Sequence, residues 1–261
     1  HGYDPDLAVW SPFHGALYAV IQAIAKIVAL GGDRRNVYLT MQEFFQSLGT
    51  DEKAWGQPVS ALLGAYTAQK AMEVAAIGGK DSMSGTFEHL TVPPTLVSFA
   101  IVPERTDHII SPEFKQPGNA VLLFDLPRDA EGMPDFEVFK THCDFLHQAV
   151  LDKKIKAMHA VGQGGVAAAA AQMAFGNGIG LEIDTDFDVQ ELFDLRYGAI
   201  LVETDTDTAV SWVRRDQVYR VGLTRGNGCM EAAGVKLTLA ALQKAWEAPL
   251  GNIFPIHSES S

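Results

Sequence analysis

The sequence has few cysteines and little positive charge. Of its 261 residues, only Cys143 and Cys229 are cysteines, and they form no CxxC pair. Isolated thiols give no disulfide framework and are typical of a reducing compartment. Lysine and arginine number 20 against 32 acidic residues, a net charge of −12. This balance argues against a nucleic-acid or anionic-membrane surface, and we expect a cytoplasmic protein.

No targeting segment and no membrane span are apparent. Residues 1–4 contain no basic stretch leading into an apolar one, so no signal peptide is predicted. The run from Gly15 to Leu30 is apolar at helical spacing, but it contains Gln22 and Lys26. We interpret it as a core helix that is too short and too polar for a membrane span. The chain also lacks an initiating Met, and we expect it to be part of a longer protein.

A dense polar and glycine-rich segment, Ile77–Thr86, is predicted to be a ligand-binding loop after a short strand. Glycines let backbone N–H groups approach a ligand closely, and a lysine beside such groups favours phosphate. Asp81 and its neighbouring hydroxyls offer the oxygen ligands that Mg²⁺ prefers. It is not a P-loop, because Val74 stands where Walker A requires glycine. The alternative is a polar turn with solvated charges. The predicted nucleotide- or phosphate-binding residues here are Gly78, Gly79, Lys80, Asp81, Ser82 and Ser84.

A second glycine-rich turn joins a predicted strand, Ile155–Val161, to a predicted helix, Val166–Phe175. Free N–H groups and the helix dipole at such a turn favour an anion. An ordinary tight strand–helix turn explains the same glycines equally well. His159 precedes the turn, either to meet a phosphate or as a buried structural histidine. The glycines added to the predicted phosphate-binding set are Gly162, Gly164 and Gly165.

A polar stripe marks the helix predicted after Gly15. Tyr18, Gln22 and Lys26 lie four residues apart and therefore share one face. The stripe is either a solvated surface or the wall of a site.

The order of strands and helices predicts an α/β chain with two α/β domains in tandem. Val37–Met41 and Leu96–Val102 are predicted strands of the first. A connector rich in proline, glycine and acids, Arg128–Pro134, places the boundary near residue 130 and divides residues 1–130 from 131–261. Later, the strand-like runs 218–223 and 235–239 are expected to be antiparallel around a glycine turn at 226–228.

Several segments resemble one family in order along the chain. GGKDSMSG (78–85) is similar to a signature in the synthetase region of phosphoribosylformylglycinamidine synthase, the glutamine-dependent ligase of purine biosynthesis. The resemblance covers nearly the whole chain and is greatest to the second synthetase half of the long bacterial form. The other family-like segments are SPFHG (11–15), NVYLTMQE (36–43), WGQP (55–58) and MHAVGQGG (158–165).

This resemblance implies a fold, a reaction and partners. The fold is that of aminoimidazole ribonucleotide synthase, in which a first domain offers its sheet for barrel-like pairing and ATP binds in the cleft beside a second α/β domain. The full enzyme converts formylglycinamide ribonucleotide, ATP and glutamine to the amidine, ADP, phosphate and glutamate. Its remaining synthetase half and its glutaminase domain would be the partners of this fragment. Alone, we expect the fragment to be inactive and to form a homodimer through the strands 37–41 and 96–102.

The sequence departs from the family at its metal ligands. Relatives carry an Asp-x-Ser-Asp-Gly-Gly sequence where this chain reads AVGQGG (160–165), and a Glu and an Asn where it has Gln22 and Lys26. The resemblance therefore implies ATP as cofactor but leaves Mg²⁺ doubtful, with Asp81 as the remaining predicted ligand. Two alternatives stay open: a degenerate scaffold half that binds no nucleotide, and a free-standing kinase or synthetase of the same fold. The residues predicted to contact substrate or to form the site wall are His14, Gln22, Lys26 and His159.

Overall fold

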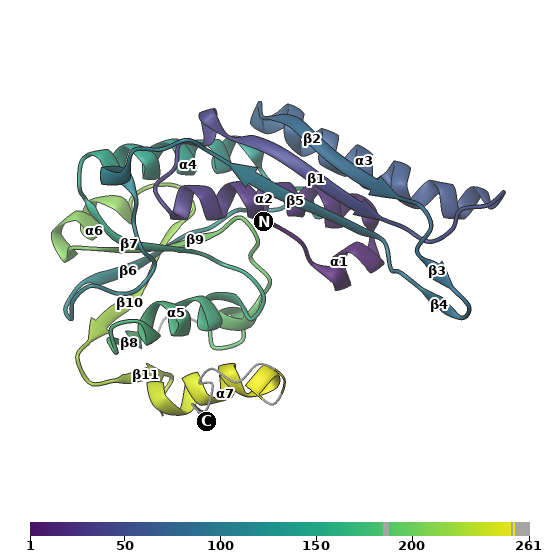
Figure 1. Ribbon diagram of the computed structural model, residues 1–261. Helices are drawn as coiled ribbons and strands as arrows, with labels where there is room; N and C mark the ends of the chain where they lie inside the picture. The colour runs from purple at the N-terminus through teal and green to yellow at the C-terminus, as the bar shows by residue number, and fades with distance from the viewer. Residues whose placement is uncertain (185–187, 252, 254–261) are drawn as a thin grey trace, which may run out of the picture.

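The chain folds around one central helix, α2 (Pro12–Ala29). The computed structural model describes residues 1–184, 188–251 and 253. On one side α2 packs against β5 (Thr95–Ile101) of a three-stranded sheet, and on the other against β7 (Ile155–Ala160) of a seven-stranded sheet. Figure 1 shows the helix between the two sheets. The mixed α/β fold expected from the sequence is confirmed.

The burial of α2 explains its composition. It begins after Ser11, whose hydroxyl accepts a hydrogen bond from the His14 N–H, and Pro12 occupies the first turn. By length and composition α2 could cross a membrane, so the expectation that it is too short was wrong. However, 72% of it is buried inside the fold. It is a core helix because sheets and helices surround it.

The first part of the chain forms a small open sheet with helices on one face. The strand order is β2-β1-β5, with β1 and β2 parallel and β1 and β5 antiparallel. Gly2 bridges to Ser98 at the free edge of β5. The bounds are α1 Pro5–Trp10, η1 Arg34–Asn36, β1 Tyr38–Phe44, α3 Glu52–Met72, β2 Ala75–Ser82, β3 Thr86–Phe87, β4 Leu90–Thr91 and η2 Thr106–His108.

The two faces of this sheet differ sharply. Leu39 is fully buried on the face that the helices cover. Its neighbour Tyr38 pairs with Ile101, and these side chains are 48% and 56% exposed on the other face. Since side chains alternate along a strand, one whole face of the sheet is open. The sheet is not closed into a barrel.

The second part of the chain is built on the larger, mixed sheet. Its order is β12-β11-β8-β10-β6-β9-β7. Helix α4 packs in the core on the α2 side of this sheet, and α5 packs on the other side. The bounds are β6 Ala120–Phe124, α4 Phe136–Leu151, α5 Gly165–Phe175, β8 Gly180–Ile183, η3 Glu191–Phe193, β9 Ile200–Thr204, α6 Thr206–Trp212, β10 Val218–Arg225, β11 Cys229–Ala232, β12 Val235–Thr238 and α7 Leu239–Gly251.

The pairing predicted around the glycine turn at 226–228 was wrong. β12 pairs with β11, and β8 lies between β10 and β11. The physical reason is that the tight turn at Ala233 and Gly234, both at positive φ, joins β11 to β12 directly. The domain boundary near residue 130 stays a prediction; β6, which precedes it, pairs within the larger sheet.

Candidate functional site

The segment predicted as a glycine loop is a strand. Gly78 to Ser82 belong to β2, the exposed edge strand that pairs with β1 in parallel. A Cβ at Gly79 would lie 2.5 Å from the Met41 carbonyl oxygen, so glycine lets the two strands approach. The loop prediction failed because glycine allows a close strand contact as readily as a turn.

Lys80 and Asp81 point to opposite faces of the small sheet. Lys80 is on the open face, where its ammonium lies 5.4 Å from the centre of the Phe44 ring. Asp81 is paired in register with Glu43 and shares the other face with it. The alternation of a strand therefore divides the side chains that sequence reasoning put in one site. Ser82 and Ser84 lie beyond them, with their hydroxyl oxygens 3.3 Å apart.

One further carboxylate lies beside Asp81, the predicted magnesium ligand. Glu43 is 6% exposed, and burial, together with the charge of Asp81, raises the pKa of its carboxyl. Protein-bound Mg²⁺ usually has one or two carboxylates plus substrate phosphates, but these two carboxylates lie on the face opposite Lys80, the predicted phosphate ligand. Within residues 1–184, 188–251 and 253, no group of three or more His, Cys, Asp or Glu side chains is arranged to hold a metal.

The second glycine turn has the geometry of an anion site. Gly164 and Gly165 both have positive φ, and a Cβ at Gly165 would lie 2.5 Å from the Leu192 carbonyl oxygen. Gly164 is the N-cap of α5 and has no side chain to satisfy the first N–H groups of the helix. The Gly165 N–H donates to the Gly162 carbonyl oxygen at 3.1 Å, so the N–H groups that follow it in the first turn, with the helix dipole, are those that favour an anion.

A buried carboxylate stands beside this turn. Asp4 is 3% exposed and accepts hydrogen bonds from the Leu7 N–H at 2.8 Å, the Gln163 amide at 3.3 Å and the Tyr197 hydroxyl. Burial alone would raise the pKa of Asp4. The hydrogen bonds that its carboxylate accepts outweigh burial and lower the pKa. Asp4 and Tyr197 were missed by sequence reasoning. The Asp-Pro pair at the start of α1 is typical of a helix N-terminus, and this signal could have identified Asp4. No comparable signal in the sequence marks Tyr197.

Residues 1–3 contact two residues of the polar stripe of α2. The Tyr3 N–H donates to the Gln22 side-chain oxygen at 3.4 Å, and the Lys26 ammonium donates to the His1 carbonyl oxygen at 2.8 Å. Gln22 is 6% exposed, and its Nε2 has no hydrogen-bond partner within the described residues. Burial lowers the pKa of Lys26. The stripe is therefore neither wholly solvated nor one open wall, because Gln22 is buried under the N-terminal segment whereas Lys26 is exposed.

Both predicted site histidines are held by the backbone. His159 Nδ1 lies 2.8 Å from the Ala160 carbonyl oxygen, and burial lowers the pKa of its imidazole. His14 Nε2 lies 3.0 Å from the Glu131 carbonyl oxygen. His14 also lines a cavity of about 210 Å³ together with Leu7, Trp10, Tyr18, Arg128, Gly132, Leu195 and Tyr197. Of the predicted wall residues, His14 alone lines this cavity.

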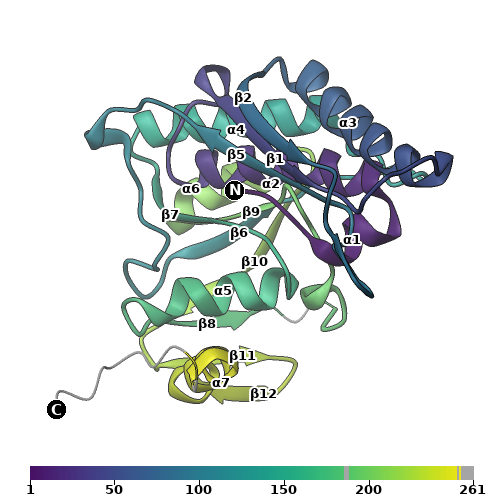
Figure 2. The same ribbon diagram turned by 45° about the vertical axis from the view of Figure 1, so that its right-hand side comes forward.

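The two glycine segments do not form one site within this chain. β2 lies in the small sheet, and α5 lies on the far side of the large sheet, with α2 between them in both views (Figures 1 and 2). The structure thus brings together the glycine turn, Asp4 and the α2 stripe, and leaves Lys80 apart on the open sheet.

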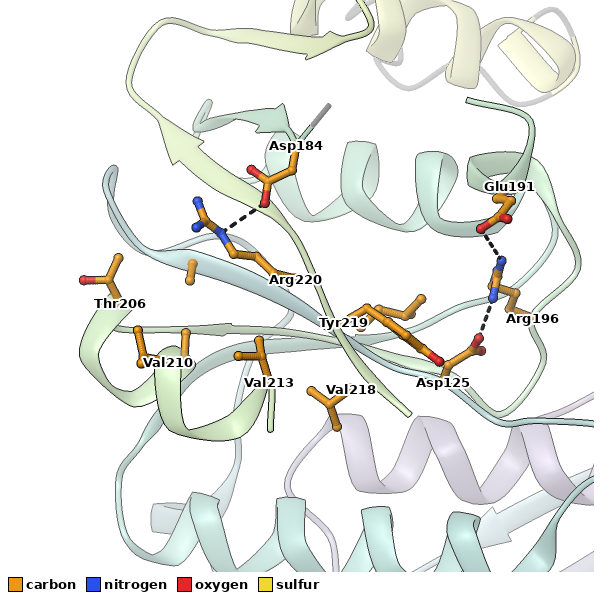
Figure 3. Close-up of a pocket in the computed structure, with 13 residues that line it drawn as sticks. Asp125, Asp184, Glu191, Arg196, Thr206, Val210, Val213, Val218, Tyr219 and Arg220 are labelled. Atoms are coloured by element: carbon orange, nitrogen blue, oxygen red, sulfur yellow. Dashed lines mark hydrogen bonds and ion pairs between the residues drawn. The ribbon is translucent and has the colours of Figure 1, made fainter. Parts of the chain in front are cut away.

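A separate groove of about 900 Å³ lies over β10 and α6. Ion pairs line it on two sides (Figure 3): Asp184 with Arg220 at 3.1 Å, and Arg196 with Asp125 and Glu191. Three carboxylates outnumber the two guanidinium groups, which disfavours a phosphate ligand. The floor is apolar and includes Val210, Val213 and Val218. Sequence reasoning did not find this groove.

Comparison with known proteins shows what the chain is similar to. Residues 118–232 match the family described as AIR synthase related protein, C-terminal domain. The chain is 23% identical over 262 aligned positions to the phosphoribosylformylglycinamidine synthase subunit PurL of Lactobacillus delbrueckii, covering 92% of the chain and 35% of that protein. It is 24% identical over 199 positions to the same subunit of Thermococcus sibiricus, covering 70% of the chain and 28% of that protein. The chain thus spans about a third of the curated relatives' length.

Solved structures share the fold. Thermotoga maritima PurL complexed with AMPPCP has a TM-score of 0.71 at 16% identity, covering 90% of this chain and 42% of that one. The hydrogenase maturation protein HypE has a TM-score of 0.64 at 16% identity, covering 86% and 81% of the two chains. The resemblance to phosphoribosylformylglycinamidine synthase and the aminoimidazole ribonucleotide synthase-like fold are both confirmed.

Proposed function

We propose that this chain is a synthetase half of a phosphoribosylformylglycinamidine synthase, an ATP-dependent C–N ligase of purine biosynthesis, and that it acts in the cytoplasm. The observation that carries the proposal is the similarity to PurL over 92% of the chain, joined to the shared fold. The PurL complexes with AMPPCP and with ATP support nucleotide binding. The chain would act as one part of a longer enzyme, because it covers 35% of that relative.

The open face of the small sheet is where we place the remaining synthetase half. Tyr38 and Ile101 expose about half of their surface there, and an uncovered apolar sheet face favours a partner. A glutaminase domain would supply ammonia. The domain boundary near residue 130 fits this arrangement, since the first part carries the open sheet.

We assign the nucleotide phosphates to Lys80. Its ammonium lies on that open face beside Phe44, so a partner half would close the site over it and exclude water. In such a site the ammonium would neutralise phosphate charge, and charge stabilisation of this kind strengthens as water is excluded. The glycine turn before α5 is a second place for an anion, with Gln163 held by Asp4.

Titration calorimetry with ATP tests the assignment. A charge-assisted contact is worth roughly 1.5–3 kcal/mol, so Lys80→Ala should weaken ATP binding by about ten- to a hundredfold. Lys244→Ala is the matched control, because Lys244 is an exposed lysine of α7, and it should leave the affinity unchanged. Equal affinity for wild type and Lys80→Ala would move the nucleotide away from β2. Absence of ATP binding by wild type would favour the degenerate scaffold.

A further inference from the structure

The outer face of α3 is apolar along most of its length. Both views place α3 on the outside of the molecule (Figures 1 and 2). Its small residues, such as Ala61, Ala65 and Ala68, are buried against the rest of the fold. Five large apolar side chains point the other way, each with more than half of its surface exposed: Trp55, Val59, Leu62, Leu63 and Tyr66. At helical spacing these five residues form one continuous stripe.

The two ends of this stripe carry opposite charges. Glu52 lies in the first turn of α3 and Lys70 in the last. They are 18 residues apart in sequence, which is five full turns, so both lie in line with the apolar stripe. A single helix face that is acidic at one end, apolar in the middle and basic at the other is complementary to its own antiparallel copy.

We propose that α3 binds the α3 of a second copy of this chain in an antiparallel pair. With the two-fold axis near Ala61, Lys70 of each copy lies beside Glu52 of the other. Val59 then faces Leu63 across the axis, and Trp55 faces Tyr66. The antiparallel arrangement also sets the helix dipoles in opposite directions. A parallel pair would instead place like charges together at both ends.

The size of the stripe sets the strength of the dimer. Five half-exposed side chains offer on the order of 500 Å² per copy, less than the about 800 Å² per partner of a standard interface. We therefore expect a weak dimer, with a Kd on the order of 1–100 µM. This contact lies on the helix layer, away from the open sheet face that the other synthetase half would cover.

Sedimentation velocity over a concentration series measures the dimer. Leu62→Glu places a charge in the centre of the stripe and should weaken association at least a hundredfold. Ile101→Glu lies on the open sheet face, where the sequence predicts a strand-mediated homodimer, and should leave association through α3 unchanged. A wild-type chain that stays monomeric at about 500 µM, well above the expected Kd, would overturn the proposal. So would a dimer that Ile101→Glu abolishes and Leu62→Glu spares, which would place the contact on the sheet.

Charge reversal tests the antiparallel register itself. Glu52→Lys alone and Lys70→Glu alone each set like charges against one another twice per dimer, so each should dimerise roughly tenfold more weakly. A mixture of the two variants should recover wild-type association, because every contact then joins opposite charges. Circular dichroism checks that each variant keeps its helix content. Failure of the mixture to associate better than either variant alone would exclude this register.

Discussion

The hydroxyl of Tyr197 donates a hydrogen bond to the carboxylate of Asp4, a residue 193 positions earlier in the sequence. The same carboxylate caps α1 and holds the amide of Gln163 in the glycine turn. One buried charge therefore ties the N-terminal segment to the turn that precedes α5. The same N-terminal segment contacts Gln22 and Lys26 through residues 1–3.

Removing the Tyr197 hydroxyl should destabilise the fold. Tyr197→Phe leaves Asp4 buried with one donor fewer, which costs about 1–3 kcal/mol of unfolding free energy. Denaturant unfolding measures this loss. Tyr219→Phe is the control, because the Tyr219 hydroxyl bonds to Gln217 at the surface, and it should change stability by less than about 0.5 kcal/mol. Equal stability of the two variants would show that the Asp4 contact contributes nothing.

Glu43 should make stability depend on pH. Its pKa is raised in the folded state by burial and by Asp81, so the folded chain binds a proton more readily than the unfolded chain. The unfolding free energy should therefore fall as pH rises from the ordinary value of 4.5 through the raised pKa. Glu43→Gln removes this dependence and should raise the melting temperature at pH 7 by a few degrees.

The control for Glu43 is an exposed carboxylate. Glu131→Gln, in the connector after β6, should leave both the melting temperature and its pH dependence as in wild type. If Glu43→Gln melts at a lower temperature than wild type at pH 7, its carboxylate stabilises the fold and the assignment of burial as the dominant effect is wrong.

The chain alone should make no amidine and hydrolyse no glutamine. Neither cysteine suits a glutaminase nucleophile, because Cys143 and Cys229 are both buried. For Cys143, burial raises the thiol pKa well above its ordinary value, and the thiolate is the reactive form. A coupled assay that detects glutamate released from glutamine measures the glutaminase activity of the chain. Steady turnover that scales with the concentration of the purified chain would contradict it.

The sequence predicted the periodic elements better than the site. Alternating and helical patterns located β1, β5, β7 and α5 within a few residues, because burial of one face dictates those patterns. Glycine was an ambiguous signal. Gly164 and Gly165 lie in a turn, as expected, whereas Gly79 lies in a strand that closely approaches its neighbour. Nothing in the local pattern distinguishes these cases, since the difference depends on which strand lies alongside.

Long-range packing determined the rest of the site. Lys80 and Asp81 are adjacent in sequence, yet the strand directs them to opposite faces. Tyr197 joins Asp4 only because the fold brings the segment before β9 beside the N-terminal segment. Such relationships follow from tertiary structure and leave no periodic signal in the sequence.

The most direct test of the central claim is the magnesium dependence of ATP binding. We propose that the chain is a nucleotide-binding synthetase half whose carboxylates Glu43 and Asp81 lie on the face of the small sheet opposite Lys80, away from phosphates bound there. Calorimetric titration of ATP into the wild-type chain, with Mg²⁺ and with a chelator, should give weak binding of nearly equal affinity in both conditions. Tight binding that the chelator abolishes would contradict the account, because it would require metal ligands that this assignment lacks.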